Sequence, residues 1–241
     1  MRFSILKSVI ITTAFLAAPA GVFSQTAPAA AAPAQVVLIF KSDPAEFGSM
    51  TLDNAPFAAP GLSKDFGSVW PVTGGKHELI IPAAGAEDKK FQLETQSGGV
   101  TLLMLGLTKN PDTAQAAKFP KVVTATSLPL ALKIPQKKAE VFAYLPPGSA
   151  TVKGELIHGN SNSVTLLLPE GKLTSLGEGQ TGFSVGGQPV VFVNPGNPGA
   201  YVFVLLPDGP SKLRSVPFSF TITEPEDPAK AAENAAKVLD Y

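Results

Sequence analysis

The sequence has no cysteine, only one tryptophan and only two histidines in its 241 residues. The absence of cysteine excludes disulfide bonds, zinc sites built on thiolates and a thiol nucleophile. The two imidazoles, His77 and His158, lie far apart in the sequence and each stands beside turn residues, which predicts solvated residues at loop edges. The acidic residues do not follow the spacing of a calcium-binding loop. We therefore expect a fold that rests on its apolar core, with no metal and no cofactor.

Charge is also scarce and balanced. Charged residues make up 16% of the chain, and 19 basic residues offset 19 acidic ones. No basic stripe with interleaved aromatic residues is present, so nucleic acid is not an expected partner. Beyond the N-terminal segment, no apolar run approaches the ~20 residues that a membrane-spanning helix needs. We expect the mature chain to have no transmembrane segment.

The first 24 residues have the layout of a secretory signal peptide. Arg2 and Lys7 precede an apolar run over residues 8–18, and small residues follow it. We predict cleavage between Ala20 and Gln25, and hence a secreted or periplasmic protein. Residues 25–34 are mostly alanine and proline, which bury little surface, so we predict a disordered spacer there.

The rest of the chain indicates an all-β fold, because short apolar runs alternate with turns rich in glycine, proline, asparagine and aspartate. Residues 36–40 form a continuous apolar run that suits a buried strand. Residues 215–223 alternate apolar and small polar side chains, as expected of a strand with one buried face. Further strands are expected at 49–53, 68–72, 77–81, 91–94, 100–107, 151–156, 163–168, 181–185, 189–193 and 200–206.

Two other segments have local signals. Gly74 and Gly75 join the apolar runs between Val69 and Pro82, which predicts a tight β-hairpin. Residues 110–118 begin with Asn-Pro-Asp and continue with alanines, which predicts a short helix or a loop.

The strand pattern starts again after a break rich in proline and lysine at residues 135–138. Residues 139–145 take the place of 34–40, and 201–206 take the place of 100–105, at an offset of about 100 residues. We predict two tandem small β-sandwich modules of immunoglobulin-like type, at 35–135 and 136–224. Residues 225–241 form an acidic and alanine-rich tail, predicted as a short C-terminal helix or a frayed end.

Two segments resemble a known family. Met50-Thr-Leu-Asp-Asn54 is a strand followed by a turn, and residues 72–80 form a later strand led by glycine. Together they are similar to the tandem extracytoplasmic bacterial modules catalogued as domain of unknown function 4397, and to the small PEGA-type β modules. The likeness covers residues 36–107 and is fainter afterwards, and Asn54 stands where the family's Asp-Gly turn has glycine. The resemblance implies an exported β-sandwich with a surface or binding role, and it transfers no functional residue.

Three features carry chemical hypotheses. Residues 177–182 match G-x-G-x-x-G, and residues 182–186 match G-x-S-x-G around Ser184. We interpret both as turn and strand sequence, because neither is followed by the helix that a dinucleotide site or a nucleophile elbow requires. Trp70 is the one candidate ligand contact, since glycan sites use aromatic faces.

The sequence favours a non-catalytic exported protein that acts as a binding or structural interaction module of the cell envelope. Its expected partner is an unknown envelope protein or a surface glycan. Two alternatives stay open: a secreted hydrolase that uses Ser184, and a carbohydrate-binding module that uses Trp70. A hydrolase should place Ser184 near a histidine, a glycan binder should expose the face of Trp70, and an interaction module should expose an apolar patch or an unpaired sheet edge.

Overall fold

The computed structural model describes residues 33–57, 62–159, 162–209 and 212–221. In these ranges the regular structure consists of β-strands and one short 3-10 turn, η1 (Pro44–Glu46), so the all-β class is confirmed. No helix within them has the length and hydropathy needed to cross a membrane. The predicted signal peptide, the spacer up to residue 32 and the C-terminal helix lie outside the described residues. Ala34, predicted as spacer, instead begins the first strand and is buried.

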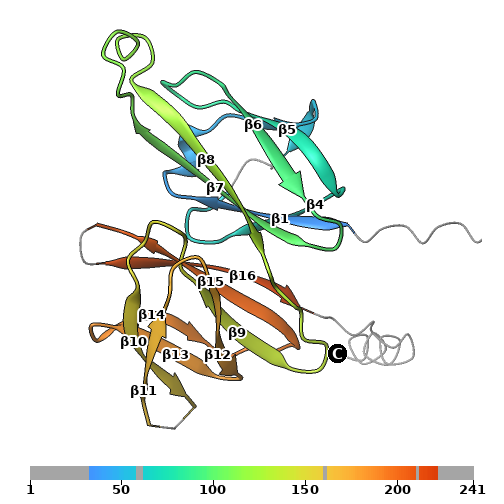
Figure 1. Cartoon of the computed structure of the whole chain (residues 1–241), viewed down its shortest axis with the longest axis vertical. Coiled ribbons are helices and arrows are strands. Elements are labelled where there is room, and N and C mark those ends of the chain that lie inside the picture. Colours follow the sequence, from blue (N-terminus) through green and yellow to red (C-terminus); the bar gives the residue numbers. More distant parts are fainter. Residues whose placement is uncertain (1–32, 58–61, 160–161, 210–211, 222–241) are drawn as a thin grey trace, which may run out of the picture. The chain divides into compact units, whose positions relative to one another are not determined.

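The first half of the chain forms two four-stranded sheets (Figure 1). The first inner sheet has the order β4-β1-β7-β8, and the first outer sheet has the order β3-β2-β5-β6. In the inner sheet, β1 runs parallel to β7 and antiparallel to β4. The strands are β1 (Ala34–Phe40), β2 (Met50–Leu52), β3 (Ala55–Phe57), β4 (Ser68–Val72), β5 (Gly75–Ile81), β6 (Lys89–Thr95), β7 (Val100–Lys109) and β8 (Lys121–Leu130).

The second half repeats this strand order. The second inner sheet is β12-β9-β15-β16 and the second outer sheet is β11-β10-β13-β14, so each strand takes the place of the strand eight numbers earlier. The parallel pair β1 and β7 recurs as β9 and β15. The strands are β9 (Ala139–Tyr144), β10 (Val152–His158), β11 (Val164–Leu168), β12 (Leu173–Glu178), β13 (Thr181–Val185), β14 (Gln188–Val193), β15 (Gly199–Pro207) and β16 (Leu213–Thr221).

Strand β1 is buried on both faces, which accounts for its uninterrupted apolar sequence. Successive side chains of a strand point to opposite faces. Val36 and Leu38 accordingly pack into a core shared with the first outer sheet, where they meet Leu79. Val37 and Ile39 pack into a different core. A strand of this kind has no polar face, so its pattern is a continuous run rather than an alternation.

This other core is built from both halves of the chain. Val37 and Ile39 of β1 lie in one cluster with Val202 and Val204 of β15. Two hydrogen bonds also join the first half to β16. The Arg214 guanidinium donates to the Phe40 carbonyl at 2.9 Å, and the Gly67 N–H donates to the Pro217 carbonyl at 2.9 Å. The two inner sheets therefore share buried surface, while the division at residue 135 stays a prediction.

The predicted hairpin at Gly74 and Gly75 is wrong. Strand β4 pairs with β1 in the inner sheet, whereas β5 pairs with β2 and β6 in the outer sheet, so the chain crosses between sheets here. Glycine is required at position 74 because of the space available and not because of the type of turn. A Cβ on Gly74 would lie 2.2 Å from Ser97 Oγ and 2.8 Å from the Ser97 backbone nitrogen. Gly74 thus allows close approach to the β6–β7 turn, whereas Gly75 has open space around it and a φ of 143°, which favours glycine.

A tight hairpin is present between β2 and β3 instead. Leu52 pairs with Ala55, which leaves a two-residue loop. Asp53 has φ 50° and Asn54 has φ 65°, the positive values of a type I′ turn, which asparagine and aspartate tolerate better than most residues.

Most predicted strands are confirmed to within a few residues, and β4 and β13 have the predicted bounds. In β16, Val216 and Phe218 are buried on one face as the alternation predicted. The short β3 and the strands β8 and β12 were not among the predicted strands. Residues 110–118 form a loop with two single helical turns, in which Asp112 Oδ1 accepts from the Ala114 N–H at 2.8 Å.

Candidate functional site

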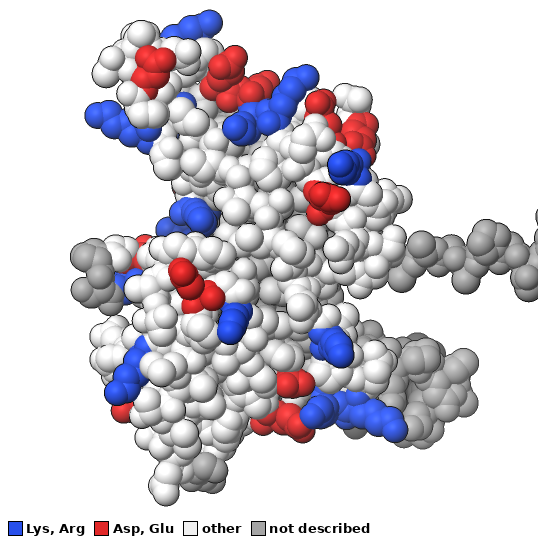
Figure 2. All heavy atoms as spheres, viewed as in Figure 1, with Lys and Arg blue, Asp and Glu red and all other residues white. Residues whose placement is uncertain are grey.

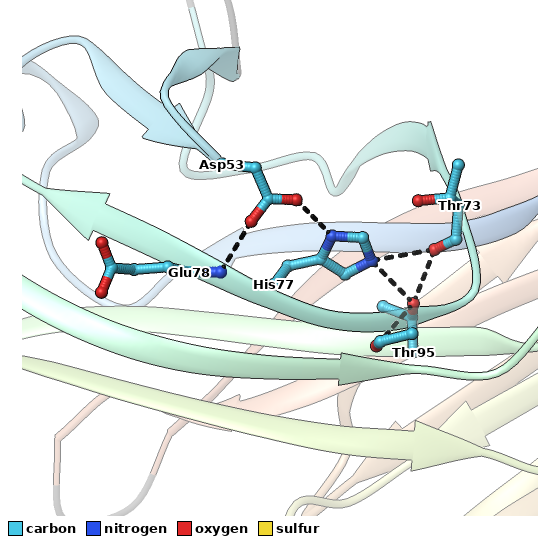
Figure 3. A network of polar contacts seen from close by, with 6 residues as sticks. Asp53, Thr73, His77, Glu78 and Thr95 are labelled. Atoms are coloured by element: carbon cyan, nitrogen blue, oxygen red, sulfur yellow. Dashed lines mark hydrogen bonds and ion pairs between the residues drawn. The ribbon is translucent and has the colours of Figure 1, made fainter.

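A buried histidine is the centre of the main polar network in the first half (Figure 3). His77, on β5, is only 6% exposed, so its prediction as a solvated residue at a loop edge is wrong. Its Nδ1 lies 2.7 Å from Asp53 Oδ2, and its Nε2 lies 3.0 Å from the Thr73 carbonyl oxygen. Because the carbonyl can only accept, Nε2 is the donor of that bond, and Nδ1 faces the Asp53 carboxylate, which is a second acceptor. The geometry therefore holds the ring between two acceptors.

Asp53 receives two hydrogen bonds in this network. Its Oδ2 accepts from His77, and its Oδ1 accepts from the Glu78 N–H at 2.9 Å. The hydrogen bond from His77 and then the one from the Glu78 N–H lower the pKa of Asp53, while partial desolvation acts in the opposite direction. Both bonds favour the ionised carboxylate at the hairpin turn.

A buried hydroxyl completes the network. Thr95 Oγ1 on β6 donates to the Thr73 carbonyl at 2.8 Å and lies 3.4 Å from His77 Nε2. The order carboxylate, imidazole, hydroxyl is that of a hydrolase triad, but Nε2 here faces a carbonyl and has no lone pair free to take the hydroxyl proton. Thr95 is also only 5% exposed. The arrangement joins the β2–β3 turn, the β4–β5 crossover and β6, and this role is structural.

The network predicts a specific acid sensitivity. Because the pKa of Asp53 in the folded protein lies below its ordinary 3.8, the carboxylate contributes stability above that pH and loses it as the pH falls through the folded-state pKa. Asp53→Asn should therefore be less stable at neutral pH and lose less further stability than the parent between about pH 5 and pH 2. Urea unfolding at a series of pH values measures this. Asp88→Asn, at an exposed carboxylate of the same half, should keep the parental pH dependence, and an equal acid loss in Asp53→Asn and the parent would contradict the assignment.

Trp70 lies on the edge strand β4. Its ring is half-buried against the core of the first half and tilts against Phe57, with ring centroids 5.9 Å apart. The indole N–H is buried and has no hydrogen-bond partner among the described residues. Part of the ring surface is thus used for packing, and its role as a ligand contact stays a prediction.

Ser184 lies in the middle of a sheet and not on an elbow. It belongs to β13, where it pairs with Glu155 of β10 and with Pro189 of β14. His158 pairs with Thr181, three positions away along the same strand. The G-x-G-x-x-G segment spans the end of β12, a glycine-containing turn and the start of β13, so strands stand on both sides of it.

Two clefts lie on either side of Lys121, whose ammonium pairs with the Glu46 carboxylate. Their volumes are about 310 Å³ and about 210 Å³. A third cleft of about 370 Å³ lies beside the β13–β14 turn and is lined by Val185, Gln188 and Lys212 rather than by Ser184. In the described part of the chain, no group of three or more potential metal ligands comes together.

The second outer sheet has an unusual outward face. Of the six large hydrophobic side chains that are exposed in the described ranges, three lie on the outward face of this sheet: Ile157, Leu167 and Phe192. A fourth, Val164, belongs to β11 but pairs with Leu156 on the inward face. Ile157 pairs with Gly182 and Gly182 with Phe192, so the three form one row across β10, β13 and β14. Phe192 is 73% exposed. Exposed apolar residues gathered on one sheet face are typical of an interaction surface.

The corresponding face of the first outer sheet is polar. There Lys76 pairs with Glu94, and Glu78 lies 3.9 Å from Lys90. On the face drawn in Figure 2, charged side chains of both signs gather over β5, β6 and β8, and a mostly uncharged area covers β11 and β13. The two halves have the same strand order, so the difference between their outer faces lies in their side chains and not in their topology.

No protein-family model matches the chain, and no curated protein matches it either. The resemblance to the extracytoplasmic modules therefore stays a prediction, and the site rests on geometry.

Sequence reasoning selected Trp70 and Ser184 and missed Ile157 and Phe192. Successive side chains of a strand point to opposite faces, so a strand over residues 188–193 already places Val191 and Phe192 on opposite faces. The sequence does not say which face is outward, nor that Gly182 stands between Ile157 and Phe192. Both facts depend on strand pairing, which periodicity does not encode.

Proposed function

We propose that the chain is an exported, non-catalytic pair of immunoglobulin-like β-sandwich modules that acts as a binding or structural interaction unit of the cell envelope. The observation that carries the proposal is the apolar outward face of the second outer sheet, around Ile157 and Phe192. The two-module reading is supported by the repeated strand order and by the core that each pair of inner and outer sheets encloses.

The partner is a protein with a complementary apolar surface. The exposed residues Ile157, Leu167 and Pro189 are aliphatic, and Phe192 is the single exposed ring among them. A glycan site would instead favour several open aromatic faces. Lys153 and Glu155 stand beside the apolar residues on the same face and supply the polar rim that protein interfaces have.

Capture of a partner should depend on Phe192. A tagged mature chain, crosslinked in its native envelope fraction, is expected to retain a stoichiometric protein partner, and Phe192→Ser should reduce the captured amount at least tenfold, as loss of a central aromatic anchor does. Quantitative mass spectrometry of the crosslinked species measures this. Gln92→Ser, at an exposed position of β6 on the polar outer face, is the matched control and should capture as much as the parent.

Two outcomes would refute the proposal. If Phe192→Ser and Gln92→Ser capture the same partner equally, the apolar face is not the binding surface. If only glycans are retained, and Trp70→Ala removes them, the carbohydrate-binding alternative replaces the proposal.

A further inference from the structure

The free edges of the sheets differ in how they resist pairing with another strand. Each sheet ends in two edge strands, and an edge strand presents unpaired N–H and C=O groups along one side. Proline, charge, bulges and short length are the means by which proteins block such edges, because each of them opposes a continuous ladder with an incoming strand.

Proline blocks most of the edges in this protein. A proline has no N–H to offer and is tolerated only where that side of the strand stays unpaired. Five edge strands contain one: Pro56 in β3, Pro71 in β4, Pro129 in β8, Pro189 in β14 and Pro217 in β16.

Charge and irregularity block two more edges. Strand β6 contains Lys89, Lys90 and Glu94. Strand β12 ends in Glu178 and has a register shift between Ser175 and Gly177 where it pairs with β9.

Strand β11 is short, with five residues, but it has no proline, no charge and no bulge. Its sequence is Val-Thr-Leu-Leu-Leu, its pairing with β10 is regular over residues 164–168, and among the described residues it pairs with nothing on its other side. Val164 is 63% exposed and Leu167 is 58% exposed. A short uncharged strand of this kind, on an open edge, is suited to strand addition.

We infer that β11 is a docking edge and that its occupant is β11 of a second copy of the chain, joined antiparallel about a two-fold axis at Leu166. A two-fold axis at Leu166 is the one position of the axis that pairs all five residues of β11 with residues of β11 in the second copy. Thr165 then stands opposite Leu167 of the second copy, and Val164 opposite Leu168. The interface is isologous, so it closes at a dimer and does not propagate.

The charges beside β11 agree with this pairing. Lys153 pairs with Leu167 and Glu155 with Thr165 on the outward face of each copy. In the joined eight-stranded sheet, each of the two outward rows that cross the junction therefore has Lys153 of one copy on one side and Glu155 of the other copy on the other side, with the two β11 strands between them. The residues that stand directly opposite each other on this face, Thr165 and Leu167, are uncharged, so no like charges oppose each other across the junction.

The inference goes beyond the proposed function, because edge pairing uses the backbone of β11, while partner capture uses the side chains of the face around Phe192, to which Leu167 of β11 also belongs. The two can fail separately. A dimer also doubles the length of that face, which would then present two Phe192 rings.

The first test is the mass of the mature chain in solution. Sedimentation equilibrium over a wide concentration range should show a reversible monomer–dimer equilibrium. Leu167→Glu places a carboxylate opposite Lys153 of its own copy, so the monomer keeps a favourable pair, while two carboxylates meet diagonally across the two-fold axis. We expect Leu167→Glu to weaken dimerisation at least tenfold without lowering the unfolding midpoint.

The second test fixes the register. Because the chain has no cysteine, an introduced thiol is unique. Thr165→Cys and Leu167→Cys chains, mixed and oxidised, should give a disulfide-linked dimer in excess over either chain alone, since positions 165 and 167 face each other across the junction while like positions are diagonal and too far apart. Gln92→Cys on the charged edge β6 should stay monomeric under the same oxidation.

Four results would overturn the inference: a monomer at every concentration, a dimer unaffected by Leu167→Glu, no excess of the mixed disulfide, or a monomeric chain whose single thiol on β11 links to a different protein. The last would assign the edge to another partner.

Discussion

Replacement of Leu206 by alanine is expected to lower the free energy of unfolding by about 3 kcal/mol, the usual cost of a buried leucine-to-alanine change. Leu206 lies on β15 in the second half, is 3% exposed, and packs in the cluster that also contains Leu102 and Val37 of the first half. The loss of packing therefore acts on both halves. We expect the first half to lose stability although none of its own residues changes.

The single tryptophan makes this measurable. Trp70 lies on β4 in the first half, so its fluorescence during urea unfolding reports on that half alone. Leu206→Ala should shift the Trp70 transition to lower urea together with the far-ultraviolet circular dichroism transition. Lys172→Ala, at an exposed position of the second half outside β11 and the apolar face, should shift neither. An unchanged Trp70 transition alongside a shifted dichroism transition would show that the halves unfold independently.

Addition of a single methyl group at Gly154 is expected to destabilise the protein by roughly 2–3 kcal/mol through overpacking. A Cβ at this buried position of β10 would lie 2.3 Å from the Phe183 ring and 2.4 Å from the Ser184 carbonyl oxygen. Phe183 is 1% exposed in the core of the second half, so the ring has little room to move. Relief of the clash requires β10 and β13 to shift apart.

Gly182 is the matched control in the same sheet. A Cβ there would meet nothing closer than Phe192 Cδ2 at 3.8 Å. Gly182→Ala should be neutral or stabilise by about 0.5 kcal/mol, because alanine in a strand interior loses less conformational entropy than glycine. Thermal unfolding of Gly154→Ala, Gly182→Ala and the parent separates the two effects. Equal midpoints for the two variants would contradict the packing argument.

The strands were predictable from the sequence because their side chains already carry the pattern of burial. Residues 215–223 alternate, and β16 has one face in the core. Residues 36–40 do not alternate, and β1 is buried on both faces. What covers the second face of β1 was not predictable. The core shared by the two halves depends on packing between residues more than 160 positions apart, such as Val37 and Val202.

The sheet assignments and the polar network were less predictable. Gly74 and Gly75 have the composition of a hairpin turn, but their spacing does not tell whether the next strand joins the same sheet or the opposite one. His77 was misjudged for the same reason. Its neighbours in sequence are turn residues, whereas its partners Asp53 and Thr95 come from the β2–β3 turn and from β6. The partner of a buried polar group is a property of the folded chain.

The parallel pairing of β1 with β7 has a kinetic consequence. Gln35 of the first strand pairs with Val100, and no neighbour closer in sequence than β4 supports β1 in its sheet. The strand β1 can therefore take its place between β4 and β7 only after the chain as far as β7 has been brought together. Closing such distant pairs costs loop entropy before any contact repays it, so we expect folding on the time scale of milliseconds to seconds that other all-β topologies of high contact order have.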